Sequence, residues 1–102
     1  MSYGYTHKQW VALHLVRQMN SIDIKVTAYS VARSMGVSHV SARKYIRMLE
    51  QSGLVYSEID SCDERENPRK LSYISEKGLE VCNQTMHVFI EWQNRRLEGL
   101  LS

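Results

Sequence analysis

Six residues able to donate hydrogen bonds stand within one short stretch in the middle of the chain. They are Ser38, His39, Ser41, Arg43, Lys44 and Arg47. Arginine can give two parallel hydrogen bonds to O6 and N7 of guanine, so Arg43 is the best candidate to read a base. Lys44 and Arg47 suit phosphate groups, which position a protein on DNA without reading sequence. This set predicts recognition of double-stranded DNA, provided that one element turns the side chains the same way.

A helix over residues 39–52 would turn these side chains the same way. Ala42, Ile46 and Leu49 recur at helical spacing and predict its inner face, so the basic side chains lie opposite. Ser38 precedes it as an N-cap, where free backbone N–H groups attract a phosphate. His39 and Ser41 fall in the first turn, which is where recognition helices touch base edges.

The residues just before this helix predict a helix-turn-helix. A two-turn helix over 28–35 begins after Thr27 and ends at Gly36, a residue type that favours helix C-termini. Two consecutive helices joined by such a turn make the arrangement used in many DNA-binding proteins. A plain helical bundle could use the same devices.

Two further elements are predicted nearer the N-terminus. The apolar pattern over 6–19 predicts an amphipathic helix, with Thr6 and Gln9 forming a capping box. Ile22, Ile24 and Val26 alternate with charged residues, which predicts a short strand over 22–26.

The second half of the chain predicts a hairpin and a long helix. Residues 54–59 and 71–75 read as two strands joined by a long polar segment that contains the turn signal Asn67-Pro68. Residues 76–101 carry an apolar stripe and predict one helix of about 38 Å. A domain of this size cannot cover so long an apolar face, so we expect it to meet a second copy of the chain.

The chain resembles the winged-helix transcriptional regulators, especially the MarR and PadR types. The resemblance is carried by Ala32, 35–38 (MGVS), 49–55 (LEQSGLV) and 73–78 (YISEKG), and it covers residues 28 to 82. It suggests a small plasmid, phage or viral member of this group. It implies an α+β, mainly helical fold: a three-helix core, a β-hairpin wing and a long C-terminal dimerisation helix.

The resemblance also implies that the tip of the wing reaches the minor groove. The basic candidates there are Arg65, Arg69 and Lys70. The stretch Asp63-Glu64-Arg65 resembles the wing of MarR proteins, in which an acidic residue orients the arginine that follows it. Four acidic residues make this segment nearly neutral, so contact of the wing with DNA stays open. They are Asp60, Asp63, Glu64 and Glu66.

Catalysis is not expected. No serine lies in a G-x-S-x-G motif, and the histidines have no spacing typical of a metal site or catalytic triad. We therefore predict no enzyme activity, metal or cofactor. A redox or metal sensor is a weaker alternative that would use Cys62 or Cys82, although Cys82 is expected to be a small buried hydrophobe.

Composition agrees with one small domain. The chain has 102 residues, 43% of them hydrophobic and 24% charged, with a net charge of +2. The charge is uneven: residues 1–57 carry +5 and residues 58–102 carry −3. A basic first half suggests a polyanionic partner. No secretory signal or apolar span is visible, so we expect a cytoplasmic protein of a bacterium, an archaeon or the host cell of a virus or plasmid.

These patterns together predict a single winged-helix domain over 1–102, with 76–101 as its dimerisation helix. The expected function is a sequence-specific transcriptional regulator that binds a pseudo-palindromic DNA site as a homodimer, with repression as the expected outcome. The residues expected at the dimer interface are Cys82, Met86, Phe89, Ile90, Trp92, Leu97 and Leu100. Two alternatives stay open: a plasmid partition or replication protein, and a winged-helix module that binds protein instead of DNA. An effector ligand cannot be named.

Overall fold

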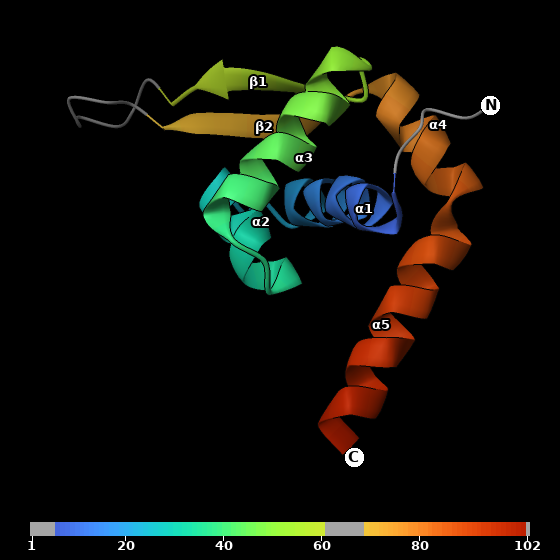
Figure 1. The fold of residues 1–102 in the computed structure, drawn as a ribbon. Helices are drawn as coiled ribbons and strands as arrows, with labels where there is room; N and C mark the ends of the chain where they lie inside the picture. Colours follow the sequence, from blue (N-terminus) through green and yellow to red (C-terminus); the bar gives the residue numbers. More distant parts are fainter. Residues whose placement is uncertain (1–5, 61–68, 102) are drawn as a thin grey trace.

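The computed structural model describes residues 6–60 and 69–101, with five helices and a two-stranded antiparallel sheet in these ranges. Figure 1 shows α1 crossing the middle of the molecule, with α2, α3 and the hairpin on one side and α4 and α5 on the other. The elements are α1 (His7–Ser21), α2 (Ala28–Met35), α3 (His39–Gln51), β1 (Val55–Ile59), β2 (Lys70–Ile74), α4 (Glu76–Gln84) and α5 (Met86–Leu101). The predicted winged-helix architecture is confirmed.

The helix-turn-helix forms where the sequence predicts it. Thr27 caps α2 by accepting a hydrogen bond from the backbone N–H of Ser30. Gly36 ends α2 in the left-handed conformation, with φ 70°, which glycine adopts without a steric penalty. Ser38 then caps α3. These three residues set the turn that separates α2 from α3.

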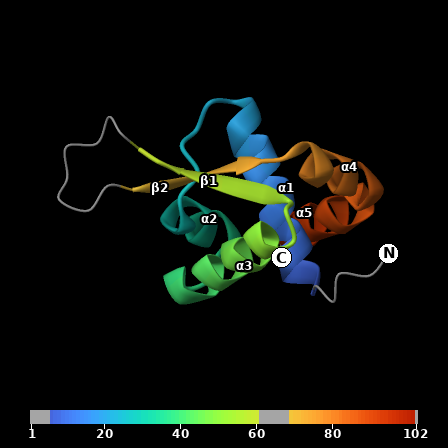
Figure 2. The same cartoon turned by 90° about the horizontal axis from the view of Figure 1, so that it is seen from above.

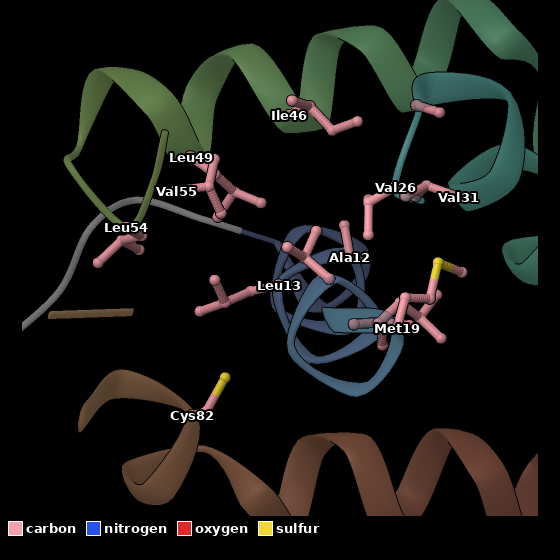
Figure 3. Packing of buried hydrophobic residues seen from close by; sticks show 14 of the residues in the cluster. Ala12, Leu13, Met19, Val26, Val31, Ile46, Leu49, Leu54, Val55 and Cys82 are labelled. Atoms are coloured by element: carbon pink, nitrogen blue, oxygen red, sulfur yellow. The ribbon is translucent and has the colours of Figure 1, made fainter. Parts of the chain in front are cut away.

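The hydrophobic core is built around α1. Leu13 and Val16 are fully buried on this helix, and Leu49 and Leu54 are fully buried against it. Figure 3 shows Leu13 in the centre, with α3 above it and Cys82 pointing toward it from α4. Burying one such leucine contributes about 1.5–3 kcal/mol to stability. The core therefore fixes α3 to α1, and with it the orientation of the outer face of α3.

The hairpin lies across the helices, with β2 against α1 and β1 against α3, and its outer ends project beyond them (Figure 2). β1 pairs with β2 in a register that places Val55 opposite Ile74 and Tyr56 opposite Tyr73. The two tyrosine rings stack at 5.5 Å on the exposed side. Both predicted strands are confirmed, while Cys62, Arg65 and Asn67-Pro68 lie outside the described residues.

The strand predicted over 22–26 is wrong. Asp23 has φ 59°, which interrupts an extended conformation, and the segment is irregular. Of its three apolar residues only Val26 is buried, while Ile22 and Ile24 remain 61% and 48% exposed. The alternation that suggested a strand therefore does not mark one buried face.

A side chain occupies part of the edge that this strand would have paired with. The amide of Asn20 donates to the carbonyl of Ser72 at 3.2 Å and accepts from the N–H of Ile74 at 2.8 Å. The carbonyl of Val26 accepts one further hydrogen bond from the N–H of Ser72, at 2.9 Å. Backbone groups along β2 are thus satisfied without a third strand.

The single helix predicted over 76–101 is also wrong, because the chain breaks at Thr85 into α4 and α5. The Thr85 hydroxyl donates to the carbonyl of Val81 at 2.8 Å. The imidazole of His14 lies beside both oxygens of Thr85. A threonine that bonds back to the preceding turn tends to bend a helix, and here a buried partner holds the bend in place.

Within residues 6–60 and 69–101, no helix is both long and apolar enough to cross a membrane. The same residues contain no cluster of three or more histidine, cysteine, aspartate or glutamate side chains suited to a metal ion.

Candidate nucleic-acid interface

The two faces of α3 divide as the sequence predicts. Ala42, Ile46 and Leu49 are buried against the core. His39, Arg43, Lys44 and Arg47 are all exposed, so the helix presents its cations to solvent in one group. The packing of α3 on α1 turns this group away from the core.

Ser38 and Ser41 work together at the start of α3. The Ser38 hydroxyl oxygen accepts from the backbone N–H of Ser41 at 3.1 Å, and the two hydroxyl oxygens lie 3.0 Å apart. A serine hydroxyl has one donor and two acceptor positions, so each side chain keeps capacity for a further partner. Their first role is to fix the N-terminus of the helix, a cap that contributes about 1 kcal/mol.

A groove runs between α3, the start of α2 and β2. Its volume is about 580 Å³. It brings five of the predicted DNA-contacting residues together from two separate parts of the chain: His39, Arg43, Arg47, Arg69 and Lys70. Four of the predicted cations therefore line one groove beside the outer face of α3, together with Glu50.

Two acidic residues neutralise the basic side chains that β2 brings to this groove. Glu50 pairs with Lys70 at 3.1 Å and also accepts from the Ser57 hydroxyl. Asp60, which is buried, pairs with Lys25 at 2.8 Å and lies 3.8 Å from Arg69. Arg69 and Lys70 therefore already have anionic partners within the chain.

The cations of α3 are in a different electrostatic situation. In the part of the chain that the structure describes, Arg43, Lys44 and Arg47 form no ion pair. A phosphate that meets these side chains does not have to displace an internal carboxylate. The positive field of the site thus comes mainly from α3, and the base of the wing adds little.

Sequence reasoning missed two exposed side chains at this site. Tyr29 lines the groove from α2, and the guanidinium of Arg33 lies 5.8 Å from its ring centre. Val40 stands in the first turn of α3 and is 75% exposed. Helical spacing places Val40 one turn before Lys44, so the sequence carried a signal for Val40, although the prediction of the interface rested on polar residues alone.

The predicted dimer residues separate into two groups. Cys82 and Phe89 are buried within their own chain, at 0% and 7% exposure, so they cannot offer surface to a second copy. Trp92 is half-buried and stacks on Phe89 at 5.7 Å. Burial raises the pKa of the Cys82 thiol to about 11, as expected for a small buried hydrophobe.

The second group stays exposed on α5. Met86, Ile90 and Leu97 follow each other at intervals of four and seven residues and share one face of the helix. Leu100 belongs to the same prediction, but its side chain lies outside the described residues. The exposed part of the predicted interface is thus a narrow apolar stripe along α5.

No protein-family model and no curated protein matches the chain. Solved structures do. The MepR–DNA complex of S. aureus is 19% identical with a TM-score of 0.70, covering 96% of this chain and 69% of that one. ZitR of Lactococcus lactis is 19% identical with a TM-score of 0.71, covering 96% and 62%. The adhesin competence repressor AdcR of Streptococcus pyogenes is 20% identical with a TM-score of 0.68, covering 94% and 66%.

The chain spans about two thirds of the length of these structures. They are winged-helix regulators of the MarR family and not enzymes, and one of them is seen with DNA. Identities this low establish similarity of fold. The resemblance to MarR-type winged helices that the sequence motifs indicate is therefore confirmed for the fold of this chain.

Proposed function

We propose that this chain is a transcriptional regulator that binds a specific double-stranded DNA sequence. The observation that carries the proposal is the outer face of α3, where Arg43, Lys44 and Arg47 are exposed together and form no ion pair within residues 6–60 and 69–101. A solvent-exposed cation group on the second helix of a helix-turn-helix suits the major groove. The DNA complex of the similar MepR structure supports this reading.

The roles of the individual side chains follow from their position. Arg43 lines the groove and carries the planar donor fork that matches guanine. Lys44 stands at the outer edge of α3 and suits a phosphate. Arg69 and Lys70 can bind DNA only by exchanging their ion pairs with Asp60 and Glu50 for a phosphate. Their contribution to DNA affinity is therefore smaller.

We further propose that the chain acts as a homodimer and represses by occupying a promoter. The stripe of Met86, Ile90 and Leu97 on α5 is the surface that a second copy would cover. A two-fold dimer would present two α3 helices to successive major grooves, about 34 Å apart, on a pseudo-palindromic site.

Selection from a pool of random DNA duplexes tests this function. The wild-type chain should enrich one sequence with two related halves. A variant with Arg43, Lys44 and Arg47 all changed to alanine should enrich none. The control removes two exposed cations on other helices, Lys8 of α1 and Arg95 of α5, by changing both to alanine, and it should enrich the wild-type sequence.

The alternatives are outcomes of the same experiment. Enrichment of tandem repeats would favour a partition or replication role. Failure of the wild-type chain to enrich any sequence or to retain DNA at low salt would reject DNA recognition and favour a protein-binding module.

A further inference from the structure

The outward face of α3 carries an exposed apolar side chain, Val40, in its first turn. Val40 is 75% exposed, more than any other large hydrophobic residue in the described part of the chain. It lies one turn before Lys44 and two turns before Arg47, on the side of α3 away from Ala42 and Leu49. A partner that binds the outer face of α3 would therefore contact Val40.

Folding gives no reason for a valine at this position. Ala42, Ile46 and Leu49 supply the inner face of the helix, and Val40 does not belong to the core that they form. A β-branched side chain also forms helix less readily than alanine. The residue therefore costs a little helix stability and exposes apolar area to water.

The edges of base pairs offer one apolar group in the major groove, the C5-methyl of thymine. Val40 stands in the first turn of α3, which is the part of a recognition helix that touches base edges. His39 and Arg43 flank it on the groove side and Lys44 on the other, so polar side chains surround its apolar tip.

We infer that Val40 is a specificity-determining residue that packs against the methyl group of a thymine in the bound DNA. This inference rests on the proposed function. It adds a contact class that the basic residues cannot provide, because arginine and lysine bind acceptor atoms and phosphates. One thymine in each half of the bound site is thereby preferred over cytosine through shape as well as hydrogen bonding.

Deoxyuridine tests the contact because it differs from thymidine only by this methyl group. The probe is the duplex that the wild-type chain enriches from the random pool, with each thymine replaced in turn by deoxyuridine. At one thymine in each half, replacement should weaken wild-type binding about fourfold, the effect of burying one methyl-sized group. Val40→Ala should bind the thymine and deoxyuridine duplexes equally.

The comparison forms a double-mutant cycle, so it isolates the contact from any general change in affinity. Ile22→Ala is the matched control, because Ile22 is also exposed and aliphatic but lies between α1 and α2. It should keep the full deoxyuridine effect. Circular dichroism should show Val40→Ala as helical as the wild type.

Three results would overturn the assignment of Val40. They are an enriched site with no recurring thymine, a deoxyuridine series without effect on the wild type, and a deoxyuridine effect that persists in Val40→Ala. A pool from which the wild type enriches nothing would instead reject the proposed function itself, and the role of Val40 with it.

Discussion

The imidazole Nε2 of His14 lies 2.9 Å from the hydroxyl oxygen of Thr85 and 3.1 Å from its carbonyl oxygen. The Thr85 hydroxyl donates its hydrogen to the carbonyl oxygen of Val81, so both Thr85 oxygens act as acceptors toward His14. Nε2 of His14 therefore carries a proton and donates it to Thr85. The other side of the imidazole is covered by Phe89, whose ring stacks at 5.1 Å. His14 thus ties α1 to the bend between α4 and α5.

The burial of His14 beside this bend makes stability depend on pH. Burial lowers the pKa of His14 below its ordinary 6.5, the Thr85 hydrogen bond opposes that shift, and the positive charges of Arg17 and His87 add to it. Below pH 6.5 the unfolded chain therefore binds more protons than the folded chain, and the free energy of unfolding falls as pH is lowered.

Urea denaturation at pH 7.5, 6.5 and 5.5 measures this effect. His14→Gln should unfold more easily at pH 7.5 and should lose part of the decrease seen toward pH 5.5. The exposed residue His39 provides the control, since His39→Gln should keep the wild-type dependence. An unchanged pH dependence in His14→Gln would show that other groups cause it.

Gly78 allows α4 to approach the chain just before β1. A Cβ atom at this position would lie 2.2 Å from the carbonyl oxygen of Leu54 and 2.7 Å from Ile74. Because one of these is a backbone atom, Gly78→Ala should shift the backbone and destabilise the protein by about 1–3 kcal/mol or more. The midpoint of urea denaturation reports the loss.

Gly99→Ala is the control for that substitution, since nothing lies within 4 Å of the added Cβ atom. Alanine forms helix better than glycine, so this variant should be equal to or up to about 1 kcal/mol more stable than the wild type. Equal stability of the two alanine variants would contradict the close approach at Gly78.

Alanine substitutions of Arg43 and Lys44 should weaken DNA binding in different ways. Arg43→Ala should weaken binding to the selected duplex by about 1–3 kcal/mol per half and affect random duplex less, because it removes a base contact. Lys44→Ala should weaken binding to both and reduce the salt slope by about 1 for each half. Equal loss on both duplexes for both variants would remove Arg43 from base reading.

The exposed stripe of α5 should hold the dimer together. Ile90 and Leu97 are 49% and 57% exposed, so changing both to glutamate should leave the fold intact while placing charges in the proposed interface. Sedimentation equilibrium should give twice the chain mass for the wild type and a single chain mass for the variant. The control Ile22→Glu should remain dimeric, and a dimeric double variant would place the interface elsewhere.

The helix-turn-helix and the hairpin could be predicted because local signals and tertiary structure agree there. Thr27, Gly36 and Ser38 each have a capping role that depends on the residue and its immediate neighbours. The inner face of α3 follows from spacing alone, and the exposure of its cations follows from that face.

The errors arose where a distant side chain decides the structure. Asn20 takes hydrogen bonds that a strand over 22–26 would have made. His14 binds the bend at Thr85, a contact between residues 71 positions apart. The pairing of Lys70 with Glu50 also depends on the fold: the sequence indicated a nearly neutral wing from the acidic residues within it, and it gave no sign that a glutamate of α3 pairs with Lys70.

The central claim is that this chain reads double-stranded DNA through α3. A fluorescence-anisotropy titration tests it most directly, using the DNA that flanks the chain's own gene and a random duplex of equal length at several salt concentrations. The account predicts tighter binding to the flanking DNA, a steep salt dependence, and loss of both when Arg43, Lys44 and Arg47 are changed to alanine. Absence of binding to either duplex at low salt, or binding that survives the triple substitution, would contradict it.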